Sequence, residues 1–169
     1  MTSEPGDARP GHGTGLTHLD ASGHARMVDV SGKDVSVREA RASGRVLLAG
    51  AAVAALRAGT VPKGDALAVA RIAGLQGAKQ TPALIPLCHP IALHAVTVDL
   101  AVADDGVDIT ATARTADRTG VEMEALTAVA VAALALIDMV KALDKGAVMT
   151  AIQLERKSGG RSGTWQRHP

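Results

Sequence analysis

The feature that most constrains this fold is an apolar run from Ala125 to Ile137 with charged residues at both ends. Ala, Val and Leu occupy every face of the helix that this run predicts, so the helix must be buried nearly all round. The acidic stretch Gly120-Val121-Glu122-Met123-Glu124 precedes it, and Asp138 and Lys141 follow it. We therefore expect the chain to fold around one central helix that carries charge at its two ends.

The residues available for the core are small. The chain has 169 residues, with one Trp and no Phe or Tyr, which suits a single domain built on Ala, Val, Leu, Ile and Met. Its net charge is +1 with His neutral, so no overall attraction to nucleic acid or to an anionic membrane is expected. The shortage of aromatic side chains also removes the usual stacking surface for single-stranded nucleic acid.

Cysteine usage and hydropathy indicate a cytoplasmic protein. Cys88 is the one cysteine in the sequence, so no disulfide can form within the chain. We see no targeting segment, and the apolar run is shorter than the roughly 18 to 20 residues that span a bilayer. We predict a disordered leader over residues 1–15, a single catalytic α+β domain over 16–157 and a Gly-rich basic tail over 158–169.

Alternation of apolar and polar residues predicts the strands. One strand is expected over residues 35–42, and a hairpin over 96–114 has Asp104-Asp105-Gly106 as its turn. A last strand is expected over 148–154.

Composition and caps predict two further helices. An Ala- and Leu-rich helix is expected over 45–58, and a second over 66–78 has Asp65 as its N-cap. Three prolines within residues 80–90 predict an extended loop. This order of elements favours an α+β sandwich with helices on one face of a mainly antiparallel sheet.

Asp138 and Lys141 are three residues apart, so a helix places them on one face. Such a pair is most often an exposed ion pair of small energetic worth. The apolar turns before it favour a second interpretation, in which the pair lies at the edge of a buried surface. An acid and a base that are desolvated there can exchange protons near neutral pH.

Cys88 and His89 lie in the proline-rich loop. A lone His is more often structural, but a stiff loop favours a functional placement of His89. No second His or Cys lies at ligand spacing, so we expect no metal site. We expect Cys88 to be a small buried hydrophobe rather than a nucleophile.

The remaining charged residues have two interpretations each. Glu122 and Glu124 either complement the helix dipole or accept hydrogen bonds from the N–H edge of a guanine-like heterocycle. The stretch 157–163 is either a basic tail or a phosphate-binding segment, to which Arg38 and Lys63 also contribute. No P-loop spacing occurs.

Five motifs stand out in chain order: Lys63-Gly64-Asp65, Leu84-Ile85-Pro86-Leu87-Cys88-His89-Pro90, Gly120-Val121-Glu122-Met123-Glu124-Ala125-Leu126-Thr127, Asp138-Met139-Val140-Lys141-Ala142 and Lys157-Ser158-Gly159-Gly160. Together they resemble the MoaC family of molybdenum cofactor biosynthesis, in the family's order and over residues 16 to 163. The resemblance implies a ferredoxin-like fold and a lyase that converts a cyclised dihydroguanosine triphosphate to cyclic pyranopterin monophosphate and diphosphate. The chain departs from the family pattern at Ile91, where Leu is commoner, and in its few aromatic residues.

The resemblance also implies the roles of particular residues. Asp138, Lys63 and Lys141 would be catalytic. It implies no required cofactor, although Mg²⁺ can accompany the substrate triphosphate, and a homo-oligomer, a hexamer built as a trimer of dimers with active sites at subunit interfaces. The implied substrate-binding residues are Leu87, Cys88, His89, Glu122, Met123, Glu124, Arg38 and Lys157.

The long helix separates two groups of these residues. From Glu124 to Asp138 it rises about 21 Å at 1.5 Å per residue, which is longer than one substrate bridges along a helix. We therefore predict that each active site combines the Asp138 end of one subunit with the Glu124 end and His89 loop of another. The main rival is a non-catalytic oligomer that binds a small anionic regulator, which would release no diphosphate; a purely structural subunit leaves the Asp138/Lys141 pair unexplained.

Overall fold

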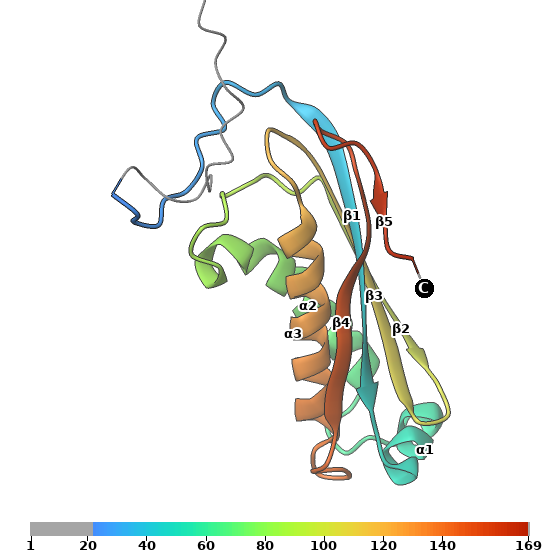
Figure 1. The fold of residues 1–169 in the computed structure, drawn as a ribbon. Helices are drawn as coiled ribbons and strands as arrows, with labels where there is room; N and C mark the ends of the chain where they lie inside the picture. The colour runs from blue at the N-terminus through green and yellow to red at the C-terminus, as the bar shows by residue number, and fades with distance from the viewer. Residues whose placement is uncertain (1–21, 169) are drawn as a thin grey trace, which may run out of the picture.

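The computed structural model describes residues 22–168 (Figure 1). The leader predicted over residues 1–15 lies outside this part of the chain. The elements in order are β1 (Ser36–Leu47), α1 (Gly50–Ala58), α2 (Ala66–Leu84), β2 (Ala95–Val102), β3 (Gly106–Asp117), α3 (Glu122–Val140), β4 (Val148–Ser158) and β5 (Trp165–Gln166).

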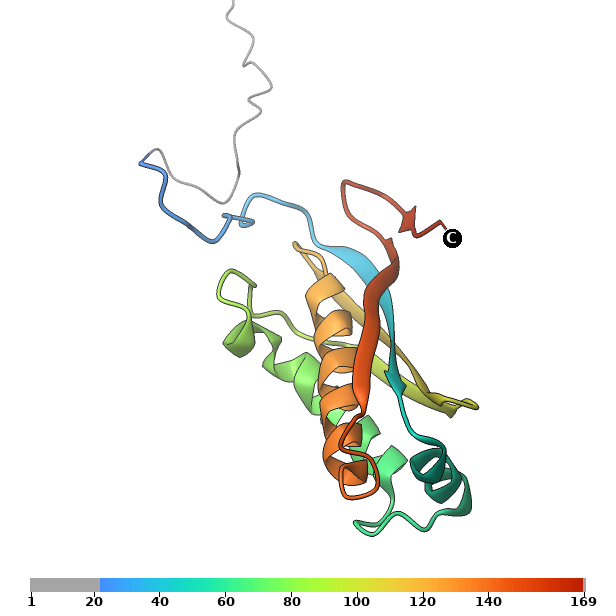
Figure 2. The same cartoon turned by 60° about the horizontal axis from the view of Figure 1, so that its bottom comes forward.

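The strands form one five-stranded sheet in the order β2-β3-β1-β4-β5. Every neighbouring pair is antiparallel, and β1 lies at the centre between β3 and β4. Helices α2 and α3 cover one face of this sheet, as the two views in Figures 1 and 2 show. The α+β class and the ferredoxin-like arrangement predicted from the sequence are confirmed.

Strand β1 is longer than its alternation predicted. It continues through Gly44 to Leu47, so the helix predicted from residue 45 begins only at Gly50. Val46 explains the difference, because it pairs with Val107 on one side and with Met149 on the other and is fully buried. Pairing on both sides of a central strand outweighs local helix propensity here.

Helix α2 also extends past its predicted end. The extended loop predicted from residue 80 was wrong as far as Leu84, because the helix continues through Pro82. Its last turn is held by packing, since Ala78 and Thr81 are buried. The predicted N-cap is confirmed, since the Asp65 carboxylate accepts a hydrogen bond from the Ala68 amide at 2.9 Å.

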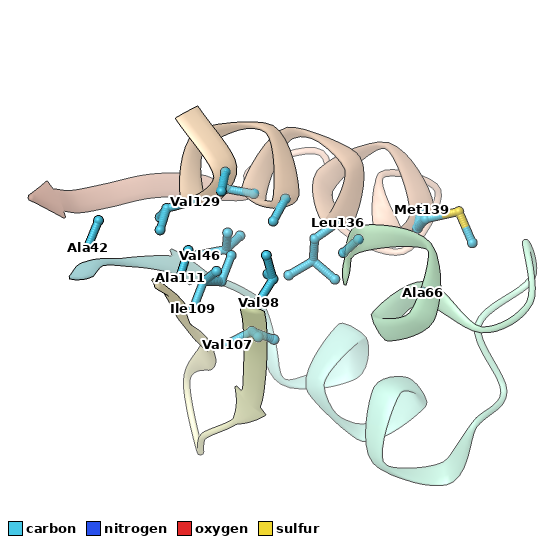
Figure 3. Packing of buried hydrophobic residues seen from close by; sticks show 14 of the residues in the cluster. Ala42, Val46, Ala66, Val98, Val107, Ile109, Ala111, Val129, Leu136 and Met139 are labelled. Carbon is cyan, nitrogen blue, oxygen red and sulfur yellow. The ribbon is translucent and has the colours of Figure 1, made fainter. Parts of the chain in front are cut away.

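Helix α3 is the centre of the core, as predicted. Val129 and Leu136 point from it toward Val46 and Ile109 of the sheet (Figure 3), and all four are fully buried. Among the described residues α3 is the one helix long and apolar enough to cross a membrane. Its packing against the sheet and α2 accounts for most of that composition, because a core helix must be apolar on most faces. The prediction that the helix is buried nearly all round was wrong for the single chain, because Leu134 is 54% exposed and Met123 37%.

Glycines let α2 approach α3 closely. A Cβ on Gly77 would lie 2.7 Å from the Cβ of Val131, and one on Gly74 would lie 2.9 Å from the Ala128 carbonyl oxygen. The two helices run in opposite directions in Figures 1 and 2. The start of α2, with Ala66, therefore lies near the end of α3, with Met139 (Figure 3).

Candidate functional site

The C-terminal end of α3 carries a carboxylate held between two lysines. Lys63 lies in the turn before α2, where the Gly64 amide donates to the Val61 carbonyl at 2.9 Å. The Lys63 Nζ donates to the Asp138 carboxylate at 2.7 Å. The Nζ of Lys141, the C-cap residue of α3, lies 2.7 Å from the other carboxylate oxygen. The structure thus brings together the three residues predicted to be catalytic.

The two lysines keep Asp138 ionised. Hydrogen bonds from Lys141 first and then from Lys63 lower the pKa of Asp138 to about 2. The three side chains are 42% to 58% exposed, so the desolvation predicted for the Asp138/Lys141 pair was wrong for the single chain. Asp138 at neutral pH is therefore a fixed anion that orients two ammonium groups, rather than a carboxyl that gains and loses a proton.

The N-terminal end of α3 borders a cavity of about 480 Å³. The loop after α2 contributes one wall and the first turn of α3 contributes another. The segment before β1, with Val28, Val30 and Lys33, forms a third. Predicted binding residues at this cavity are Leu87, Cys88, His89, Glu122, Met123 and Glu124.

Glu124 is the group here that titrates near neutral pH. It is 3% exposed, and burial, with a smaller contribution from the charge of Glu122, raises its pKa to about 7. Burial and the Glu124 carboxylate also raise the pKa of the Cys88 thiol, which agrees with the prediction that Cys88 is no nucleophile. The near-neutral acid sought at Asp138 therefore lies at the opposite end of the helix.

His89 is oriented by the segment before β1. Its Nε2 lies 2.7 Å from the Val28 carbonyl oxygen, and a carbonyl only accepts, so Nε2 carries a proton in this contact. The sequence patterns did not identify Val28, because the contact joins residues 61 positions apart.

A second cavity of about 190 Å³ adjoins the first and is lined by several cationic side chains. Lys157 of β4 lies here, with its Nζ 2.9 Å from the Glu122 carboxylate. Arg38 of β1 donates from Nε to the Asp117 carbonyl at 2.9 Å and from Nη2 to the Arg118 carbonyl at 3.1 Å. These bonds fix the guanidinium plane at the cavity wall, as binding of an anion requires.

Two cations at this cavity were missed from the sequence. Lys33 and Arg118 both line it, and the Arg118 Nε donates to the Lys33 carbonyl at 2.9 Å. Arg118 stands two residues before the Gly120 motif, which is the one signal that could have identified it.

The predicted site residues form two groups. The cavities at the start of α3 hold the eight predicted binding residues, whereas Lys63, Asp138 and Lys141 lie at its far end. Within residues 22–168, no three His, Cys, Asp or Glu side chains form a group that could hold a metal ion.

Comparisons with known proteins cover the part of the chain that holds both groups of site residues. The model of the MoaC family matches residues 27–160. The cyclic pyranopterin monophosphate synthase of Streptomyces coelicolor is 68% identical over 152 residues, covering 90% of this chain and 89% of that protein. The proteins of the same name from Nocardioides sp. and Novosphingobium aromaticivorans are 64% and 58% identical, covering 90% and 89% of this chain and 95% and 96% of their own lengths.

Proposed function

This chain belongs to the MoaC family, and we propose that it converts a cyclised dihydroguanosine triphosphate to cyclic pyranopterin monophosphate and diphosphate. The reaction is a step of molybdenum cofactor biosynthesis. It opens and recloses the purine-derived ring system, closes a cyclic phosphate and expels diphosphate. The protein is thus a lyase that breaks a phosphorus–oxygen bond.

The observation that carries this proposal is the Lys63–Asp138–Lys141 group. Ring opening and reclosure require proton transfers from groups held in place. Asp138 holds both lysine Nζ atoms at 2.7 Å, which fixes their positions relative to each other. In our proposal the lysines donate and accept the protons, while Asp138 orients them and stabilises cationic intermediates.

The cavity at the start of α3 suits the purine-derived ring. Its walls include the apolar side chains of Leu87 and Met123, which can contact the faces of a flat ring. The carboxyl groups of Glu122 and Glu124 can accept hydrogen bonds from the paired N–H donors of a guanine-like edge. Glu124 can also exchange a proton, because its pKa is about 7.

The adjoining cavity suits the triphosphate. Arg38 and Lys157 line it and present donors to phosphate oxygens, and His89 at the neighbouring cavity is a further candidate. Cations there stabilise the charge that develops on leaving diphosphate. We propose that the reaction requires no redox cofactor. Mg²⁺ can enter with the triphosphate, since Mg²⁺ in such sites is bound largely by substrate phosphates and water.

We further propose that one active site draws on two subunits of a hexamer, a trimer of dimers. The two residue groups lie at opposite ends of α3, about 21 Å apart by helix rise. A neighbouring subunit would cover apolar side chains that are exposed in the single chain, such as Leu134 of α3 at 54% and Val148 of β4 at 51%. A single chain that kept full activity on dilution would exclude this arrangement.

We also propose a cytoplasmic location, as expected for a chain with one free cysteine.

Incubation with the cyclised triphosphate tests the function directly. The wild-type protein should release diphosphate and form the pyranopterin product, which mass spectrometry detects. Asp138→Asn and Lys63→Ala should form none, because each removes part of the proton-transfer group. Asp108→Asn is a matched control, since Asp108 is an exposed carboxylate on the sheet, paired with Arg45.

Two outcomes would contradict the proposal. A wild-type protein that bound the substrate without releasing diphosphate would be a binding module. Asp138→Asn with wild-type turnover would remove the assigned role of the lysine group. Circular dichroism and size-exclusion chromatography on each variant would show that fold and assembly are retained.

A further inference from the structure

The chain after β4 folds back along the sheet. Residues 159–164 form a turn, and β5 then pairs with β4, with Lys157 opposite Trp165. The Arg167 amide donates to the Glu155 carbonyl at 2.8 Å, and its Nε donates to the Leu154 carbonyl at 2.9 Å. This segment, which we call the C-terminal hairpin (residues 158–167), is therefore anchored at its far end.

The C-terminal hairpin contributes a wall to two cavities that are lined by Lys33 and Arg38. Ser162 lines the cavity of about 190 Å³. Gly160 and Arg161 line a neighbouring cavity of about 340 Å³, which shares Lys33 and Arg38 with the first. Together the two cavities offer the cationic side chains of Lys33, Arg38 and Arg161 to phosphate groups.

Gly160 lies directly against the Arg38 guanidinium. Its φ is +70°, and a Cβ at this position would overlap Arg38 Nη1 and lie 2.7 Å from Cζ. The guanidinium has little room to move away, because Nε and Nη2 are bonded to the Asp117 and Arg118 carbonyls. Any side chain at residue 160 must displace either Arg38 or the hairpin.

We infer that Gly160 is a positioning residue whose missing side chain lets the C-terminal hairpin close on Arg38, and that Arg161 completes the binding of the outer phosphates. The identity of the ligand, a polyphosphate ester, rests on the function proposed above. The geometry itself supplies two cationic side chains on one cavity, Arg38 from β1 and Arg161 from the hairpin, which can bind neighbouring phosphate groups.

A pair of glycine variants tests the inference. Gly163 has φ of +65° and nothing within 4 Å of its Cβ position, so Gly163→Ala carries the same backbone strain as Gly160→Ala without the contact with Arg38. Calorimetry with inorganic tripolyphosphate should show binding weakened about 10-fold or more by Gly160→Ala, the loss expected when a charge-assisted hydrogen bond is displaced. Gly163→Ala should bind nearly as wild type does.

Turnover gives a second readout. Gly160→Ala should both raise KM and lower kcat for the triphosphate substrate, because the displaced Arg38 binds the phosphates and stabilises the charge on the leaving diphosphate. In an Arg38→Ala background, Gly160→Ala should have little further effect on binding. Equal losses from the two glycine variants, or an undiminished Gly160→Ala effect without Arg38, would overturn the inference.

Arg161→Ala keeps the test decisive if Gly160→Ala does not fold. Arg161 is exposed, so its removal should leave the fold intact and still weaken tripolyphosphate binding, whereas Arg57→Ala on α1 should not. Unchanged binding by Arg161→Ala would refute the role of the hairpin. A wild-type protein that binds tripolyphosphate with this contrast but releases no diphosphate from the cyclised substrate would refute the proposed function alone.

Discussion

Replacement of Glu124 by Gln should make the protein more stable, and more so as pH rises. Glu124 is 3% exposed, and burial raises its pKa from an ordinary 4.5 to about 7. The folded state therefore holds the proton more tightly than the unfolded state does. Below about pH 4.5 both states are protonated and no penalty exists; the penalty grows through pH 4.5 to 7 and is complete above that range.

The magnitude follows from the size of the shift. A difference of about 2.5 pKa units at 1.36 kcal/mol per unit gives a penalty of about 3 kcal/mol at pH 8 and about 1 kcal/mol at pH 5. Glu124→Gln keeps the size of the side chain and removes the charge. The stability advantage of the variant over wild type should thus grow by about 2 kcal/mol between pH 5 and pH 8.

Urea denaturation at fixed protein concentration, followed by circular dichroism from pH 5 to pH 8.5, measures this difference. Asp108→Asn is the control, because Asp108 is an exposed carboxylate paired with Arg45, and its loss should give no gain at pH 8. An advantage of Glu124→Gln that did not change with pH would refute the assignment of a buried, near-neutral carboxyl. The variant should also lose activity, since a destabilising group retained in a binding cavity is commonly functional.

Two further predictions concern the elements that place the lysine group. Gly77→Ala should destabilise the protein by about 1 to 3 kcal/mol, because the new methyl overlaps Val131. Val131→Ala in the same chain should recover part of this loss in thermal denaturation. No recovery would mean that the α2–α3 contact is not the cause. Asp65→Ala should cost about 1 kcal/mol through loss of the α2 cap, whereas Asp65→Asn, which keeps an acceptor oxygen, should cost less; equal losses would argue against the cap.

Much of the fold could be predicted because it depends on neighbours in sequence. The apolar period of α3, the Asp-Asp-Gly turn of the β2–β3 hairpin and the Asp65 cap are local patterns with local causes. The pairing of Asp138 with Lys141 is also local, because residues three apart on a helix share a face. The role of Lys63 was implied by resemblance, and the close antiparallel packing of α2 on α3 accounts for its position beside them.

What the tertiary structure decided depends on residues far apart in the chain. Val46 belongs to a strand because β3 and β4 pair with it, and Pro82 stays helical because its turn is packed. Glu124 titrates near neutral pH through burial, whereas Asp138 remains exposed, so the sequence alone placed the near-neutral acid at the wrong end of α3. The central helix and its charged ends were determined by the sequence, but burial, which no local pattern encodes, assigned each end its chemistry.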